Sequence, residues 1–487
     1  MSSSAIGLII AGYFLLLIIV SRLTARKGDN AEFFTGGRNA HWMVVAFGMI
    51  GASLSGVTFI SVPGWVATSQ FSYMQMVLGY ILGYALIAGV LLPVYYRLRL
   101  TSIYTYLKDR FGNSSYKTGA SFFLISRVIG ASFRLFLVAL VLRNFVFDEQ
   151  LDSLVENYRW INDSVAFLGI IVLTILLIWV YTSKGGIKTI IWTDTLQTVC
   201  MLLAVVIAVI GIGDAMQLNI KGIINEVKDS EYSQIFFWGD GAGKKHFVKQ
   251  FLSGAGIALV MTGLDQDMMQ KNLACKNLKD AQKNVLSLSV VLVFVNLLFL
   301  SLGALLYLYA SESGIVIPEK ADLLFATVAL EGGLGPLIGL FFILGLIASA
   351  YSSADSALTA LTTSFYVDML DSPGKTEKES IAVRRKVHVG MSVALVLVIW
   401  LFYMINDESV IASLFRLAGY TYGPLLGLYA FGLFTKREVR DKWVPLICVL
   451  APAISWLLAT YIYPFGFELL LINGAITFMG LMVIMRK

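Results

Sequence analysis

The sequence predicts an all-α polytopic membrane protein. Hydrophobic residues make up 57% of the 487 residues and charged residues only 14%, whereas soluble domains carry roughly a quarter charged residues. Apolar runs of about 20 residues, the length at which a helix spans a bilayer, recur along the whole chain. These runs do not alternate apolar and polar residues, as the strands of a membrane β-barrel would.

Charge and cysteine content argue against other classes. The net charge of +6 comes from basic residues in short loops between the apolar runs, so it is not a nucleic-acid signature. The three cysteines lie in or beside predicted helices and indicate no disulfide framework. The first apolar run lacks a basic leader and a small-residue cleavage site, so we expect a retained helix rather than a signal peptide.

About thirteen membrane helices fit the apolar runs. We expect them at 5–22, 41–69, 71–97, 116–147, 163–182, 187–212, 246–271, 283–311, 334–368, 384–405, 409–434, 441–463 and 465–485. Every second loop is basic, and the intervening loops are acidic or mixed, as at Asp148-Glu149 and Asp407-Glu408. The positive-inside rule then predicts a plasma (inner) membrane protein with its N-terminus outside and its C-terminus in the cytoplasm.

Two of these helices are expected to be interrupted. Met49–Gly64 is rich in glycine and serine and contains Pro63, and Gly254–Lys271 places glycines before Asp265, Gln266 and Asp267. Small residues let a helix unwind at little steric cost, and proline removes a backbone donor. Broken helices five spans apart predict two inverted repeats with the binding site at their interface. The single transporter domain would comprise a leading helix at 5–22, repeats at 41–212 and 246–434, and two trailing helices at 441–485.

A hydroxyl stripe follows one face of the helix predicted around Gly345–Thr363. Its members recur at spacings of three and four, which places them on one helix face: Ser349, Ser352, Ser356, Thr359 and Thr363. Asp355 shares that stripe. Crowded hydroxyl and carboxylate oxygens suit a small hard cation, and an intramembrane carboxylate is by default a functional group. The alternative, helix packing through small residues, explains the serines but not the aspartate.

Further polar residues lie at membrane depth. Arg127 and Arg134 are seven residues apart and share a helix face,. A buried arginine can clamp a carboxylate or form an internal salt bridge, and both alternatives stay open. Asp265 is read as either a helix cap or an inner gate. Asp194 lies one or two turns into its helix, where a cap or a salt bridge is the alternative to a functional role.

The segment around the first predicted break also contains polar side chains that could bind a solute. Ser53, Ser55 and Thr58 offer hydroxyls beside it, and Tyr73 and Gln75 open the next helix, where they could form the outer wall of a pocket. Three histidines lie in or near loops, and no nucleophile–base cluster is visible. A membrane enzyme is therefore not expected.

The order of these segments resembles the sodium:solute symporter family, whose members carry sugars, sialic acid, proline, vitamins, carboxylates or iodide. The matching segments are Phe33-Phe34-Thr35-Gly36-Gly37-Arg38, Ser53–Thr58, Gly185-Gly186, Trp192-Thr193-Asp194 with Gln197, Asp265-Gln266 with Gln270, Ser352–Ser356 with Asp368, and Gly423-Pro424. The resemblance implies the amino-acid transporter scaffold with five-plus-five inverted repeats, and sodium as the coupling ion without any other cofactor.

The resemblance also implies two sodium sites. The first would use backbone oxygens near Gly51, Leu54 and Ser349 with the hydroxyls of Ser352 and Ser353. The second, present in sialic acid symporters among others, would use Asp194, Ser352, Asp355 and Ser356. Asp355 stands where those members have a hydroxyl, so this second site would hold two carboxylates and take either a second sodium or a proton.

The implied solute pocket resembles that of sialic acid symporters in Ser53, Ser55 and Thr58. Two positions depart from that pocket. The carboxylate-binding arginine of sialic acid symporters falls at Gly130, which is flanked here by Arg127 and Arg134. The pocket glutamine of those symporters falls at Val77, near Gln75. The acid and amide of sugar symporters are Val57 and Thr58 here. We expect a small anionic solute such as sialic acid or another carboxylate, with proton-coupled or sugar transport, or a sensor or channel, as the rival readings.

Overall fold

The computed structural model of the chain describes residues 3–24, 30–145, 162–239, 241, 243–370, 376–405 and 410–486. Within these ranges every named element is a helix, and only two isolated β-bridges occur. Nine of the described helices are long and apolar enough to cross a membrane, or ten if a bent pair counts as one span. The all-α membrane class is therefore confirmed. The loop acids Asp148-Glu149 and Asp407-Glu408 lie outside the described residues.

The longer helices follow the predicted runs. They are α1 (Ser3–Thr24), α3 (Trp42–Ser53), α4 (Gly56–Ser69), α5 (Tyr73–Leu86), α8 (Asn113–Phe145), α10 (Asp163–Ala215), α12 (Phe247–Ala258), α14 (Leu278–Glu312), α16 (Pro336–Ser364), α17 (Glu377–Ile405), α18 (Val410–Phe434), α19 (Val444–Tyr461) and α20 (Leu469–Val483).

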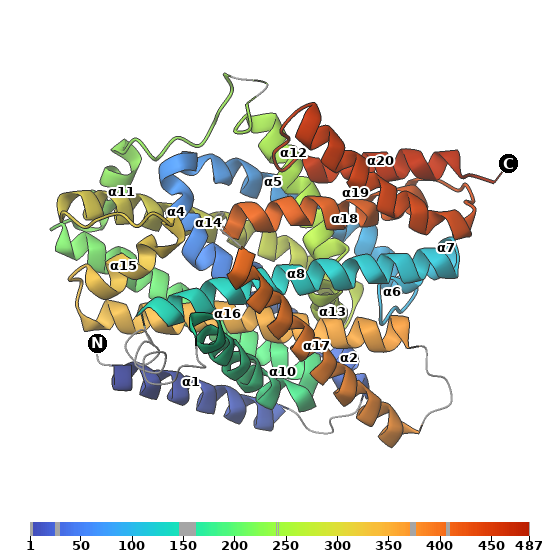
Figure 1. Cartoon of the computed structure of the whole chain (residues 1–487), viewed down its shortest axis with the longest axis horizontal. Coiled ribbons are helices and arrows are strands. Elements are labelled where there is room, and N and C mark those ends of the chain that lie inside the picture. The colour runs from blue at the N-terminus through green and yellow to red at the C-terminus, as the bar shows by residue number, and fades with distance from the viewer. Residues whose placement is uncertain are drawn as a thin grey trace.

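Shorter helices connect these. They are α2 (Asn30–Thr35), α6 (Leu92–Arg97), α7 (Thr105–Arg110), α11 (Ile220–Asp229), α13 (Gln266–Leu273) and α15 (Leu324–Glu331). The sequence did not predict α2, α7, α11 or α15, because they are too short to give a membrane-length apolar run. In Figure 1, α11 and α15 gather at one end of the helix stack and α7 at the other.

The runs expected at 163–182 and 187–212 form one element, α10, bent at Gly186. Gly186 has a left-handed φ of 52°, which glycine adopts without strain. A Cβ there would also lie 2.5 Å from the Cα of Phe33. Two independent constraints thus require glycine at this corner, which turns the chain back into the membrane.

The first break separates α3 from α4. Leu54 ends α3 with φ −90° and ψ 74°, and Ser55 is extended before α4 begins at Gly56. Pro63 lies inside α4, so the chain unwinds at Leu54-Ser55 rather than at the proline.

The second break follows α12. A π-helical turn at Leu259–Gly263 leads into Leu264 and Asp265, and α13 then departs at 64° to the preceding helix. The interruption predicted in Gly254–Lys271 is therefore present, and it includes Asp265.

The helices α5 and α12 pack backbone to backbone. A Cβ on Gly254 would lie 2.0 Å from the carbonyl oxygen of Met76, and a Cβ on Gly79 would lie 2.0 Å from that of Phe251. Backbone cannot move aside as a flexible side chain can. This contact fixes α12, and with it the second break, against the helix that follows the first break.

We expect Gly254→Ala to destabilise the folded protein by about 1–3 kcal/mol, the usual cost of overpacking. Its thermal midpoint in detergent should fall below that of the wild type. Gly390→Ala on α17 is the matched control, because a Cβ there meets nothing within 4 Å. Equal midpoints for the two variants would show that α5 and α12 are not in close contact.

The helix α16 lies at the centre of the arrangement. It contacts α8, α10, α17 and both halves of the first broken helix, and Figure 1 shows it running beneath α8, with α10 and α17 crossing it. Every residue of α16 from Gly345 to Ser364 is buried. The predicted hydroxyl stripe therefore faces protein and not lipid.

Candidate ion and solute sites

Four hydroxyls of the α16 stripe divide into two groups, and the fifth, on Thr359, has no hydrogen-bond partner among the described residues. Ser349 and Thr363 donate back to carbonyl oxygens of their own helix, those of Leu346 and Thr359. Ser352 and Ser356 instead donate across to the carboxylate of Asp194 on α10, at 2.7 and 3.3 Å. Packing through small residues accounts for the first group, and the second group forms part of a buried ionic cluster.

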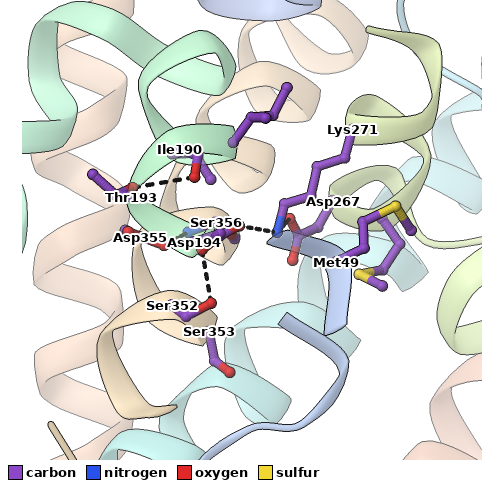
Figure 2. Close-up of polar contacts among 12 residues, drawn as sticks. Met49, Ile190, Thr193, Asp194, Asp267, Lys271, Ser352, Ser353, Asp355 and Ser356 are labelled. Carbon is purple, nitrogen blue, oxygen red and sulfur yellow. Dashed lines mark hydrogen bonds and ion pairs between the residues drawn. The ribbon is translucent and has the colours of Figure 1, made fainter. Parts of the chain in front are cut away.

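Asp194 is fully buried at the centre of that cluster. Besides the two serine hydroxyls, its Oδ2 meets the Nζ of Lys271 on α13 at 2.7 Å. Figure 2 shows Lys271 reaching from α13 to the carboxylate that Ser352 contacts from below. Lys271 is itself buried and lies 3.9 Å from Oδ1 of Asp267, one helical turn away.

Asp355 lies beside Asp194 but has different partners. Its Oδ2 accepts a hydrogen bond from Tyr181 at 2.9 Å, and its Oδ1 accepts one from the backbone N–H of Ser356 at 2.5 Å. It makes no ion pair with any described residue. The structure thus brings together Asp194, Ser352, Asp355 and Ser356, and adds Lys271, to which the sequence analysis gave no role in a site.

The groups expected at the first sodium site lie around the first break. Gly51 is in the last turn of α3, where helix carbonyls lack intrahelical partners. A Cβ on Gly51 would lie 2.3 Å from Oγ1 of Thr198, so α3 lies tightly on α10 one turn beyond Asp194. Across the break, a Cβ on Gly56 would lie 3.7 Å from Oγ of Ser349. Ser353, whose Oγ donates to the carbonyl of Ser349 at 3.3 Å, follows on the same helix.

A cavity opens beside the first break. Six residues expected at the solute site line it: Ser53, Ser55, Thr58, Tyr73, Arg127 and Arg134. Tyr80, Tyr84, Thr262 and Asn296 complete its polar wall, together with apolar side chains of α12 and α14. The hydroxyl oxygen of Ser53 is buried without a hydrogen-bond partner among the described residues.

Two residues expected at the solute site do not line this cavity. Gln75 is fully buried, donates to the carbonyl of Lys245 at 2.9 Å and accepts from the backbone N–H of Phe237 at 3.1 Å. It anchors the segment before α12, because its side chain turns to that segment and away from the break. Asp265 caps α13 through the N–H of Asp267 and accepts from Tyr422 at 2.6 Å. The capping interaction expected of Asp265 is therefore present.

The two arginines differ in their counter-ions. Arg127 forms a short ion pair with Asp267, and its Nη1 lies 3.8 Å from Asp265. For Arg127 the internal salt bridge is thus present. Arg134 is 6% exposed, and its Nε and Nη1 have no hydrogen-bond partner among the described residues. No described carboxylate pairs with it. A buried cation without a partner is expensive, and this guanidinium lines the cavity.

A model of the sodium:solute symporter family matches residues 33–441. The sodium/sialic acid symporter SiaT of Proteus mirabilis is 24% identical over 473 residues, which cover 93% of this chain and 89% of that protein. The sodium/iodide cotransporter of Homo sapiens is 26% identical over 450 residues, covering 87% of this chain and 65% of that protein.

The fold is similar to that of a solved transporter. A sodium-coupled sialic acid symporter in a substrate-bound outward-open state superposes with a TM-score of 0.82 at 19% identity, covering 98% of this chain and 97% of that one. At this identity the likeness shows the fold alone.

Proposed function

Given that this chain belongs to the sodium:solute symporter family, and so is a sodium-coupled transporter and not an enzyme, we propose that it imports a small anionic organic solute. Sialic acid or another carboxylate fits the proposal. The relative from Proteus mirabilis is a sialic acid symporter, and the cavity here has the hydroxyls of Ser53, Ser55 and Thr58 on its wall.

The observation that carries the anionic assignment is Arg134. Its guanidinium lines the cavity, is buried, and lacks a protein counter-ion among the described residues. Arginine presents paired N–H groups that match a carboxylate in bidentate geometry. A neutral sugar would leave this charge unpaired, so a bound anion is the better complement.

Sodium bound at the first site would couple the entry of sodium to the uptake of the solute. The proposed ligands are backbone oxygens of Gly51, Leu54 and Ser349 with the hydroxyls of Ser352 and Ser353. This site joins the first broken helix to α16, while Ser53 and Ser55 beside the same break face the solute cavity. Sodium would therefore order the segment that also holds the solute, and both ligands would favour the same conformation, as coupling requires.

A second cation position is formed by Asp194, Ser352, Asp355 and Ser356. The alternatives for it are a second sodium ion or a proton. The identity of this cation sets the coupling stoichiometry, since each charge moved inward contributes about 2.3 kcal/mol per 100 mV of membrane potential.

For the architecture we propose thirteen membrane helices, with five-plus-five inverted repeats at 41–212 and 246–434, a leading helix at 5–22 and two trailing helices at 441–485. The two breaks open the proposed repeats. The bilayer would be the plasma (inner) membrane, with the N-terminus outside and the C-terminus in the cytoplasm, in agreement with the basic loops.

Removing the Ser353 hydroxyl tests the first sodium site. We expect Ser353→Ala to raise the sodium concentration for half-maximal uptake roughly tenfold, since one ligand to the ion is lost. Ser289→Ala is the matched control, because Ser289 is also buried and its hydroxyl bonds only the carbonyl of Leu286. An unchanged sodium dependence in Ser353→Ala would remove this residue from the site.

Imposing the gradients separately in proteoliposomes tests the proposed coupling. Solute uptake should follow an inward sodium gradient at equal pH and should saturate with solute, which a channel would not do. Uptake driven equally well by a pH gradient without sodium would favour the proton-coupled alternative instead.

A further inference from the structure

The second cation position already contains a positive charge from the protein. The Nζ of Lys271 lies 2.7 Å from Oδ2 of Asp194, inside a cluster that includes Ser352 and Ser356. We propose that the Lys271 ammonium is a tethered cation at this position, so that the transporter binds one sodium ion per chain and not two. This inference rests on the proposed sodium coupling.

The contacts of Asp194 support this assignment. Oδ1 accepts from Ser352, and Oδ2 meets both Ser356 and Lys271. At 2.7 Å the ammonium and the carboxylate form a close, fully buried ion pair. The ammonium thus contacts Oδ2, the same carboxylate oxygen that accepts from Ser356. Placing sodium there would bring two cations together in a buried site, where repulsion is poorly screened.

The charges of the cluster also favour one bound sodium ion per chain. Asp194 and Asp355 contribute two negative charges when ionised, and Lys271 contributes one positive charge, which leaves one negative charge in the cluster. Asp267 also lies 3.9 Å from Lys271, but its charge is paired with that of Arg127 and does not change this sum. A single sodium at the first site neutralises the remaining negative charge, because that site shares Ser352 with the cluster. A second sodium would leave a buried net positive charge.

The tether has a consequence for transport. Sodium leaves with the solute, but Lys271 belongs to α13 and stays with the protein. Its ion pair also holds α13 to α10, which in turn receives hydrogen bonds from α16. The charge of the second position would therefore stabilise the protein without being transported, and would not add to the driving force.

Equilibrium binding of ²²Na⁺ to the purified full-length protein tests the inference. We expect one ion per wild-type chain. Lys271→Met removes the ammonium at similar side-chain length and leaves both carboxylates, so it should bind two. Lys271→Arg, which keeps a cation, and Lys276→Met, which removes an exposed lysine five residues along, should each bind one.

Two ions bound per wild-type chain would overturn the proposal. The wild-type measurement therefore tests the proposal even if Lys271→Met fails to fold. One ion on a folded Lys271→Met would overturn the claim that the ammonium fills a sodium-competent position. No sodium on the wild type would instead contradict the sodium coupling itself, and the two failures are thereby distinguished.

Discussion

Replacing Arg134 with alanine should raise the apparent KM for an anionic solute by roughly 10- to 100-fold. A hydrogen bond to a charged group contributes about 1.5–3 kcal/mol, and each 1.4 kcal/mol corresponds to about a factor of ten. Because Arg134 has no carboxylate partner among the described residues, its loss should cost binding without breaking an internal ion pair. Initial uptake rates over a range of solute concentrations give this KM.

Two further variants give this prediction its controls. Arg134→Lys retains the charge but not the planar fork, so it should fall between the wild type and Arg134→Ala. Arg143→Ala removes an arginine near the end of the same helix, where Arg143 pairs with the exposed Asp163, and should leave KM unchanged. If Arg134→Ala keeps the wild-type KM, the solute is not held through this guanidinium.

Arg127→Met should destabilise the folded protein by roughly 3–5 kcal/mol, the cost of removing one partner from a buried ion pair. Arg127 is paired with Asp267 and lies 3.8 Å from Asp265. Its removal would leave Asp267 in the protein interior with only Lys271 at 3.9 Å. A lowered midpoint in thermal unfolding of the detergent-purified protein measures the effect.

The double variant Arg127→Met with Asp267→Asn separates this ion pair from simple packing. Removing both charges should recover part of the lost stability, because no uncompensated carboxylate remains at that pair. A stabilising Arg127–Asp267 pair would be contradicted if Arg127→Met were as stable as the wild type. It would also be contradicted if the double variant lost more stability than Arg127→Met and Asp267→Asn lose in sum.

Much of the fold could be predicted because a membrane helix requires an apolar run of about 20 residues, which is visible in the sequence. The runs that became α1, α14, α16 and α19 lie within five residues of their expected bounds. The breaks could be predicted from glycine and serine content, but not their exact position. Pro63 was the strongest local signal for the first break, yet the chain unwinds at Leu54-Ser55, because α4 accommodates the proline inside its helix.

The site was predictable where one helix face defined it. Periodicity placed Ser352, Asp355 and Ser356 on one stripe, which the structure buries. The seven-residue spacing placed Arg127 and Arg134 on one helix face, and both line the cavity. The spacing could not show that Arg127 has a counter-ion and Arg134 has none among the described residues, since Asp267 is 140 residues away from Arg127 along the chain. Lys271 was missed for the same reason: its partner Asp194 belongs to another helix.

Paired solutes provide the most direct test of sodium-coupled uptake of an anion. Carboxylates, with sialic acid among them, would be offered to proteoliposomes together with their uncharged methyl esters, with and without an inward sodium gradient. At least one acid should accumulate, only with sodium, while its ester should not. Equal accumulation of acid and ester, or accumulation that persists without sodium, would contradict the account.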